Sequence, residues 1–344
     1  MRVAVLTGGG DAAGLNAAIR AVVRRAISLD FDILGVRNGW DGLLGGGNLR
    51  RLDTRSVSGI LHLGGTVLGT SRANPLKSPE DFEQVLANIK AFGIEGLVVI
   101  GGPDTLGVAA ELQEKWGKVV GVPKTIDNTL NGSDASIGYS TAVAVVAEAL
   151  DRLHTTASSH HRVLLAEVMG RDAGWVATAG GLAGGADMII IPEEPTDLET
   201  ICNHVLARRA RGREFSIIVV SEAAVITDLS DEGIDLGKPD PYGRVKLDRR
   251  NIGERLAAEI EKRTGLETRF IVLGYLQRGG APTAEDRILA TRLGVAAVDY
   301  LAEGKFGNVP CLCGGKLQPI PLRDVVSKSR PADMELYQLA KLFF

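Results

Sequence analysis

Two ionisable residues stand three positions apart in the segment 121–129, which reads GVPKTIDNT. Lys124 could neutralise phosphate charge, and Asp127 could take a proton from an alcohol. The segment follows a short apolar run, which predicts a loop at the carboxyl end of a buried strand. Ligands of open α/β sheets bind at that edge. The same residues are also typical of a solvated turn in which Asp127 and Asn128 cap their own backbone, so the segment alone leaves both interpretations open.

The bulk composition is that of a globular protein with two domains or one large one. The chain has 344 residues, of which 45% are hydrophobic and 24% charged. The net charge of -3 gives no electrostatic reason to expect nucleic acid as a partner, although a local arginine cluster could still hold a phosphorylated ligand. The 43 glycines fall in short clusters beside apolar runs, which suits turns where the backbone approaches a ligand.

Cysteine and histidine residues do not form a framework. Cys202, Cys311 and Cys313 are too few and too unevenly spaced for a disulfide scaffold, and no second Cys or His pair accompanies the CLC sequence as a metal site. His160 and His161 are adjacent, so they cannot share a helix face as metal ligands, and surface or capping roles are expected.

No targeting or membrane signal is recognisable in the sequence. The amino terminus opens on a strand pattern without a charged segment followed by a long apolar one. No apolar run approaches the ~18 residues of a membrane span. The sequence therefore predicts a soluble, cytoplasmic protein without a membrane partner.

A glycine loop follows the first predicted strand. Residues 2–6 are apolar, residues 7–11 read TGGGD, and apolar residues then recur at helical spacing over 15–27. A strand, a glycine loop and a helix in this order form an anion cradle, because backbone N–H groups converge at the helix amino terminus. The loop matches neither GxxxxGK[ST] nor a full GxGxxG, so neither of the two commonest nucleotide-binding motifs is present.

The same unit recurs along the first half of the chain. Apolar strands are predicted at 31–36, 97–100 and 119–122, with a helix at 80–91 and a further glycine cluster at 101–107. Consecutive strand ends present small residues together with Asp11, Asp104, Lys124 and Asp127. Repeated strand–loop–helix units indicate a mostly parallel sheet covered on both faces.

The second half begins with a long helix from Ser140 to Leu153, which is expected to link two lobes. Buried strands are predicted at 163–168, 188–191, 216–220 and 269–273. The charged segment 228–250 predicts an exposed excursion. The last ~30 residues are expected to hold one further helix and no charged active-site motif.

Six sequence blocks, taken in order, resemble the phosphofructokinases, and within them the pyrophosphate-dependent bacterial type. They are LTGGGDAAGLNAAIR, GGTVLGTSRANP, VVIGGPDTLG, VPKTIDNTL, SHHRVLLAEVMGRDAGW and VLGYLQRGGAP, and they span nearly the whole chain. The resemblance implies an α/β fold of two similar three-layer lobes with mostly parallel sheets. It implies a donor-binding lobe of residues 1–138 plus about 277–327, and a sugar-phosphate-binding lobe of residues 139–276 plus about 328–344.

The resemblance also implies phosphoryl transfer to the 1-hydroxyl of fructose 6-phosphate. Asp127 would be the base for the attacking hydroxyl, Arg171 would stabilise charge on the transferring group, Thr125 would help place the sugar, and Lys124 would supply charge to the donor. The residues that the resemblance assigns to the donor are Gly10, Arg72, Asp104, Thr105 and Lys124.

The sugar phosphate would bind among residues of the second half. By resemblance these are Met169, Gly170, Arg171, Glu222, Tyr275 and Arg278, while Arg162 and Arg269 would reach the 6-phosphate from a neighbouring subunit. The active protein would then be a homodimer or homotetramer. Arginine forks match phosphate oxygens bidentately, so this inventory suits the reaction.

Two positions indicate the donor. ATP-using relatives carry glycine where this chain has Asp104 and Lys124. Asp104 would crowd and repel the α-phosphate of ATP, and Lys124 would supply charge to a phosphate that carries no adenosine. The favoured donor is therefore pyrophosphate, with a reaction close to equilibrium and no allosteric control by nucleotides.

The sequence departs from the family pattern near the expected Mg²⁺. Pro103 and Thr129 stand where the family usually has acidic residues, and smaller departures are Ala12-Ala13 and Asp172. Mg²⁺ binding should be weakened or moved onto Asp104 and the oxygens of the donor.

These departures leave other functions open. The alternatives are a paralogue that acts on another ketose or sugar phosphate or uses another donor, and a non-catalytic subunit. A dinucleotide-binding oxidoreductase is poorly supported without GxGxxG.

Overall fold

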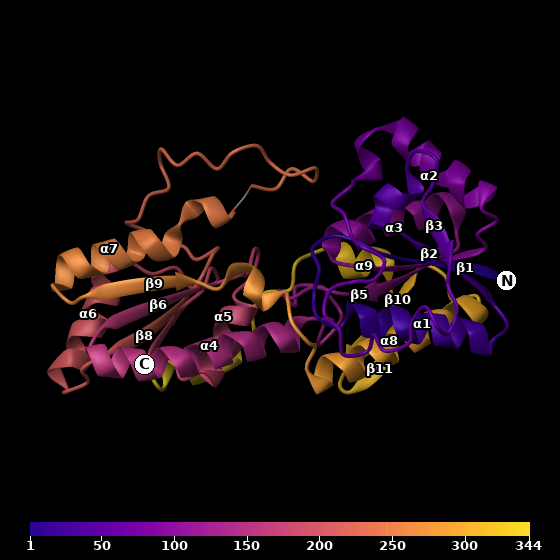
Figure 1. The fold of residues 1–344 in the computed structure, drawn as a ribbon. Coiled ribbons are helices and arrows are strands. Elements are labelled where there is room, and N and C mark those ends of the chain that lie inside the picture. The colour runs from indigo at the N-terminus through magenta and orange to yellow at the C-terminus, as the bar shows by residue number, and fades with distance from the viewer. Residues whose placement is uncertain (246) are drawn as a thin grey trace. The chain divides into compact units, whose positions relative to one another are not determined.

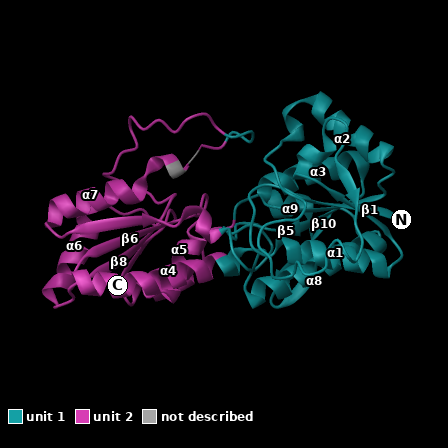
Figure 2. Ribbon diagram, in the orientation of Figure 1, with its two compact units in different colours: residues 1–141, 240–243, 278–329 teal, residues 142–239, 244–277, 330–344 magenta. Residues whose placement is uncertain are grey.

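The computed structural model describes residues 1–245 and 247–344. The chain forms two compact units, coloured in Figure 2. The first comprises residues 1–141, 240–243 and 278–329, and the second comprises residues 142–239, 244–277 and 330–344. The predicted lobe boundaries place 240–243 with the second lobe, whereas these residues pack with the first compact unit.

The first unit is built on a five-stranded sheet with the strand order β3-β2-β1-β4-β5. Its strands are parallel except for β3, which pairs antiparallel with β2. The elements are β1 (Arg2–Thr7), α1 (Leu15–Ser28), β2 (Asp32–Val36), η1 (Gly39–Leu43), β3 (Leu49–Arg51), η2 (Pro75–Lys77), α2 (Pro79–Ala91), β4 (Gly96–Gly101), α3 (Pro103–Trp116), β5 (Val119–Pro123) and α8 (Ala284–Ala302).

Strand β4 shows why this sheet is covered on both sides. All six of its residues are buried, and successive side chains point to opposite faces. Val98 and Ile100 join a core cluster with α1 and α8. Leu97 and Val99 join a second cluster with α2 and α3. Helices therefore lie on both faces of the sheet (Figure 1), as the continuous apolar strands predict.

The first unit ends with an antiparallel hairpin of β10 (Asn308–Cys313) and β11 (Lys316–Pro321), followed by α9 (Leu322–Val326). The second unit then adds α10 (Met334–Lys341). The expectation of one helix in the last ~30 residues is wrong, since these residues hold β11 and two helices. Proline occurs in both strands and β11 also carries polar residues, so the sequence pattern did not indicate the hairpin.

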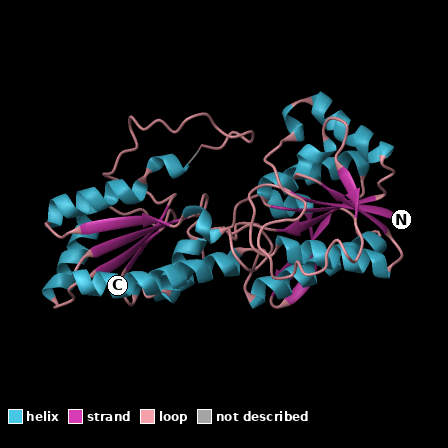
Figure 3. Cartoon of the chain, in the orientation of Figure 1, coloured by secondary structure: helices cyan, strands magenta, loops and turns pink. Residues whose placement is uncertain are grey.

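The second unit contains a four-stranded parallel sheet with the order β7-β8-β6-β9. Figure 3 shows its strands lying between helices. Its other elements are α4 (Tyr139–His160), β6 (Val163–Val168), α5 (Trp175–Ala183), β7 (Met188–Ile190), α6 (Leu198–Ala210), β8 (Ser216–Ser221), η3 (Leu247–Arg250), α7 (Ile252–Thr264), β9 (Thr268–Val272) and η4 (Gly274–Gln277).

Small residues let α5 approach α4 closely. A side chain at Gly180 would bring its Cβ within 2.6 Å of Val146, and one at Gly184 would come within 2.5 Å of Leu150. On the opposite face, α6 and α7 share a core cluster with the strands. The predicted α/β class with mostly parallel sheets is confirmed.

The predicted excursion 228–250 has irregular backbone over 228–245 and ends in η3, and it includes residue 246, which lies outside the described residues. It is not exposed throughout, because Tyr242 is half-buried and the Asp240 side chain is 9% exposed. The three cysteines are free thiols, as expected. His160 and His161 are exposed, and His161 Nδ1 lies 2.9 Å from Glu214. None of the described helices is both long enough and apolar enough to cross a membrane.

Candidate active site

The glycine loop after β1 is held open by its neighbours. The Gly8 N–H donates to Ile100 O at 3.0 Å, and the Gly9 N–H donates to Ser71 O at 2.9 Å. The Thr70 hydroxyl donates to Gly9 O at 2.7 Å. Gly9 has a φ of 78°, a conformation that favours glycine. Hydrogen bonds to β4 and to residues 70–71 therefore fix the backbone of the loop before α1 begins.

Other side chains also come close to the glycine loop. A Cβ at Gly8 would lie 2.6 Å from Thr105 Cγ2, and a Cβ at Gly10 would lie 2.9 Å from Arg278 Nη1. Thr105 is buried in the first turn of α3, and Arg278 Nη1 donates to Asp11 O at 3.1 Å. The structure thus brings Gly10, Thr105 and Arg278 together, whereas the sequence groups Arg278 with the sugar phosphate.

Lys124 lies beneath this loop. Its side chain is buried, and Nζ donates to Gly8 O at 2.9 Å and to Gly10 O. Burial lowers the Lys124 pKa to about 7, with a further lowering by Arg278, while Asp11 and Asp127 act in the opposite direction. The ammonium charge therefore titrates near neutral pH, at the base of the glycine loop.

The segment that carries Asp127 has features of both the turn and the ligand-binding loop that the sequence left open. The Asp127 N–H donates to Thr125 Oγ1 at 3.2 Å, and Asn128, with a φ of 53°, accepts the Ser136 N–H at 3.0 Å. Ser136 Oγ donates to Thr125 O at 2.6 Å. Asn128 thus stabilises the turn, while Asp127 interacts electrostatically with Lys124.

Arg72 and Asp104 complete the predicted donor residues. Asp104 occupies the first turn of α3, where the helix macrodipole favours a negative charge. Arg72 Nη1 lies 3.8 Å from Asp240 Oδ2. Asp240 and Tyr242 are neighbours of this site that the sequence did not predict, because a charged segment rich in Gly and Pro carries no sign of the surface on which it folds.

In the second unit, two strand ends meet beside Gly170. The Met169 N–H donates to Gln277 Oε1 at 3.2 Å, and the Gly170 N–H donates to Glu222 Oε1 at 3.3 Å. A Cβ at Gly170 would lie 2.7 Å from Ala173 O, so only glycine fits there without a shift. Met169 and Gly170 follow β6, and Glu222 follows β8.

The arginines of the second unit lie at separate places. Arg171 Nη1 donates to Val245 O at 2.9 Å. Arg162 and Arg269 instead share the Glu267 carboxylate, with N–O distances of 2.8 and 2.6 Å. Tyr275 is 74% exposed. The structure therefore pairs Arg162 with Arg269, which the resemblance assigns jointly to a neighbouring subunit's ligand.

The predicted residues thus fall into two sets. The first unit holds Gly10, Arg72, Asp104, Thr105, Lys124, Thr125, Asp127 and Arg278, and the second holds Arg162, Met169, Gly170, Arg171, Glu222, Arg269 and Tyr275. Within residues 1–245 and 247–344, no three His, Cys, Asp or Glu side chains are grouped so that they could hold a metal ion by themselves.

Comparison with known proteins identifies the family. The family model described as Phosphofructokinase matches residues 2–301. The chain belongs to the phosphofructokinase family.

Relatives differ in the donor that their names state. A Streptomyces coelicolor protein named pyrophosphate–fructose 6-phosphate 1-phosphotransferase is 49% identical over 350 residues, which cover 100% of both chains. A Corynebacterium efficiens protein named ATP-dependent 6-phosphofructokinase is 43% identical over 346 residues, which cover 100% of this chain and 99% of the relative. The family resemblance stated from the sequence is confirmed.

A solved structure supports the same fold. Phosphofructokinase from Pichia pastoris superposes with a TM-score of 0.81 at 32% identity. The match covers 99% of this chain but only 36% of the Pichia chain, so this protein corresponds to about a third of that one.

Proposed function

We propose that this protein transfers a phosphoryl group from pyrophosphate to the 1-hydroxyl of fructose 6-phosphate. The observation that carries the proposal is the position of Lys124. Its buried ammonium donates hydrogen bonds to the carbonyls of Gly8 and Gly10 beneath the glycine loop, which we take as the donor site. Asp104 adds a negative charge at the start of α3, which opposes a longer polyphosphate donor. The Streptomyces coelicolor relative, whose name states this reaction, supports the same assignment.

The residues of the first unit have complementary roles in this reaction. Asp127 accepts the proton of the attacking hydroxyl, and it interacts electrostatically with Lys124. Arg72, Lys124 and Arg278 neutralise charge on the donor and the leaving phosphate. Phosphoryl transfer requires mainly positioning and cation density from a protein, so this division is chemically sufficient.

Mg²⁺ fits this set of residues. Asp11, Asp104 and Asp127 follow the carboxyl ends of β1, β4 and β5 and offer only oxygen atoms, which Mg²⁺ prefers. Mg²⁺ in such sites uses one or two carboxylates and takes other ligands from substrate phosphates and water. Asp104 is the proposed protein ligand, and bound Mg²⁺ would neutralise phosphate charge. Without carboxylates at Pro103 and Thr129, we expect its binding to be weak in the absence of pyrophosphate.

The second unit is proposed to bind the sugar phosphate. Glu222 and the backbone around Met169 and Gly170 would position the sugar hydroxyls. Arg171 would stabilise charge on the transferring group, and Tyr275 is exposed enough to contact a ligand.

We further propose a homo-oligomer in which Arg162 and Arg269 bind the 6-phosphate held by a neighbouring subunit. Strand β9 lies at the edge of its sheet and exposes apolar side chains. Phe270, Ile271 and Val272 are 42%, 40% and 50% exposed. Exposed apolar edge strands favour pairing with another chain. The same strand carries Arg269, so an interface here would place this arginine near the second copy. A cytoplasmic location is part of the same proposal.

The decisive experiment is a coupled assay on the purified protein with fructose 6-phosphate and Mg²⁺, run separately with pyrophosphate and with ATP. Activity with pyrophosphate and little or none with ATP is expected. Activity with ATP alone would refute the donor assignment. Inactivity with both donors would refute the acceptor assignment and favour a paralogue that acts on another sugar phosphate, because the arginines for a phosphate group are present.

Shared sites can be tested by mixing two inactive variants, Asp127→Ser and Arg269→Ala. If Arg269 acts on the neighbour's site, a mixed dimer regains one complete site of two. Random mixing should then restore about a quarter of wild-type activity. No recovery after confirmed subunit exchange would exclude shared sites.

A further inference from the structure

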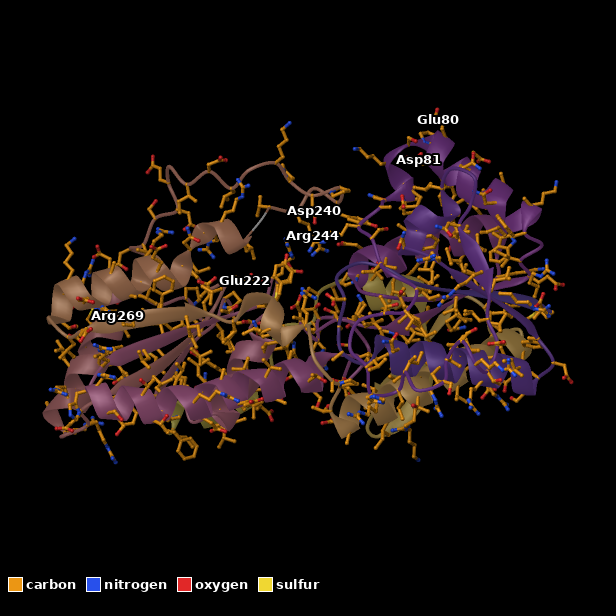
Figure 4. The ribbon with its side chains drawn as sticks, in the orientation of Figure 1. Glu80, Asp81, Glu222, Asp240, Arg244 and Arg269 are labelled. Carbon is orange, nitrogen blue, oxygen red and sulfur yellow. The ribbon has the colours of Figure 1, made fainter. Side chains whose placement is uncertain are left out.

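The segment Asp240–Gly243 packs with the first unit, next to residues 73–74, although the residues before and after it belong to the second unit. The Tyr242 hydroxyl donates to Ala73 O at 2.8 Å, and Asn74 Nδ2 donates to Pro241 O at 3.3 Å. These contacts lie directly after Arg72, a proposed donor ligand. Asp240 is labelled in Figure 4.

The sequence DPYG gives this segment a defined shape. The Gly243 N–H donates to Asp240 O at 2.9 Å, and the Tyr242 N–H donates to Asp240 Oδ1 at 3.0 Å. Pro241 presets the second position of the turn, and Gly243 has a φ of 80°, which glycine adopts without strain. The turn is therefore preorganised and holds Tyr242 in place.

Tyr242 fills space beside the donor residues. Tyr242 packs against the apolar cluster shared with α2 and α3, and its hydroxyl contacts Ala73. Burial raises the Tyr242 pKa, and the nearby carboxylates of Asp104 and Asp240 raise it further. The tyrosine thus lies near Asp104, the residue proposed to oppose the α-phosphate of ATP.

We propose that Asp240–Gly243 forms a wall of the donor site that excludes the nucleoside part of a nucleotide. This inference rests on the proposed function, because it takes Arg72 and Asp104 as donor residues. Pyrophosphate ends where a nucleotide continues into its α-phosphate and ribose. A nucleotide that extends past Asp104 along residues 72–74 would have to displace Tyr242, whereas pyrophosphate would not.

Asp240 adds an electrostatic component to the wall. Its carboxylate is 3.8 Å from Arg72, whose side chain is 48% exposed. Before the donor binds, the Asp240 carboxylate attracts the Arg72 guanidinium and keeps it oriented. A bound donor carries more negative charge than one carboxylate, so it replaces Asp240 as the partner of Arg72. Asp240 also repels any further phosphate that approaches from the side of the turn.

The test compares Tyr242→Ala with Tyr242→Phe in the full-length protein. The measured quantities are kcat/KM for pyrophosphate and for ATP, and the affinity for ADP from calorimetry. Tyr242→Ala should raise the ATP-to-pyrophosphate ratio of kcat/KM by about 10-fold or more and strengthen ADP binding, since the ring no longer occupies the space. Tyr242→Phe keeps the ring and should leave the ratio and the ADP affinity near those of the wild type.

If a folded Tyr242→Ala protein has the wild-type ratio of kcat/KM for ATP to that for pyrophosphate, and the wild-type affinity for ADP, the proposal that Asp240–Gly243 excludes a nucleoside is refuted. If that variant does not fold, Tyr242→Val retains apolar packing while shortening the side chain, and the same two readouts decide. A wild-type protein that is inactive with pyrophosphate would refute the proposed function. The ADP titration would still decide the wall, because it requires no turnover.

Discussion

Pyrophosphate affinity should fall steeply above neutral pH because of Lys124. The lysine has a pKa of about 7 in the protein without donor, against 10.5 for an unperturbed side chain. A bound pyrophosphate favours the ammonium form, so above pH 7 the protein must take up a proton when the donor binds. At pH 7 about half of the molecules carry that proton, and at pH 9 about one in a hundred. The apparent dissociation constant should therefore rise by about 50-fold between these pH values.

The assay is titration calorimetry with pyrophosphate at constant excess Mg²⁺, from pH 6 to 9, without the sugar phosphate. Repeating each titration in buffers of different ionisation enthalpy gives the number of protons taken up, which should approach one above pH 8. Lys124→Met is the control, since it removes the titrating group but leaves the ionisation of pyrophosphate itself. Parallel pH profiles for the wild type and Lys124→Met would refute the assignment of the donor-linked proton to Lys124.

The same shift has an opposite consequence for folding. Between pH 7 and 10.5 the unfolded chain carries a proton on Lys124 that the folded protein lacks, so this group makes the free energy of unfolding rise with pH in that window. Stability and donor affinity should thus change in opposite directions, which separates the linked proton from simple alkaline denaturation.

Three further variants test the proposed residues. Asp127→Ser should lower turnover by at least ~10²-fold with little change in pyrophosphate affinity, and near-normal turnover in the coupled assay would remove it as the base. Asp104→Gly combined with Lys124→Gly should raise ATP use relative to pyrophosphate, and an unaltered kcat/KM ratio would mean that donor choice lies elsewhere. Pro103→Asp combined with Thr129→Asp should lower the Mg²⁺ concentration for half-maximal activity, and an unaltered Mg²⁺ titration would show that neither position ligates the metal.

Much of the fold could be predicted from the sequence because buried parallel strands are continuous apolar runs. β4 and β6 are fully buried, so no polar alternation confuses their assignment. The glycine loop was equally recognisable, because glycines between a strand and a helix have few other uses. The hairpin β10–β11 was missed since its exposed strand β11 has proline and polar residues that resemble a loop.

The candidate site was predictable as an inventory of residues but not as a set of contacts. Sequence suggests that Lys124 meets phosphate, whereas the structure buries its ammonium against Gly8 and Gly10, so the charge acts through the loop it supports. Arg278 similarly belongs beside Asp11, more than 260 positions away in the chain. Such contacts depend on tertiary packing, and no local pattern in the sequence encodes them.

Donor choice in this family cannot reside in the fold. Relatives named for pyrophosphate and for ATP are 49% and 43% identical to this chain over nearly their whole lengths, so the backbone is common to both. We infer that the difference comes from a few side chains that meet the donor beyond its second phosphate. In the donor site proposed for this protein, that place is assigned to the charge of Asp104 and the ring of Tyr242, which would act by different physical means. A carboxylate would oppose an extra phosphate, and a half-buried ring would oppose a nucleoside, so each could vary in evolution without disturbing the proposed base or the proposed phosphate-binding cations.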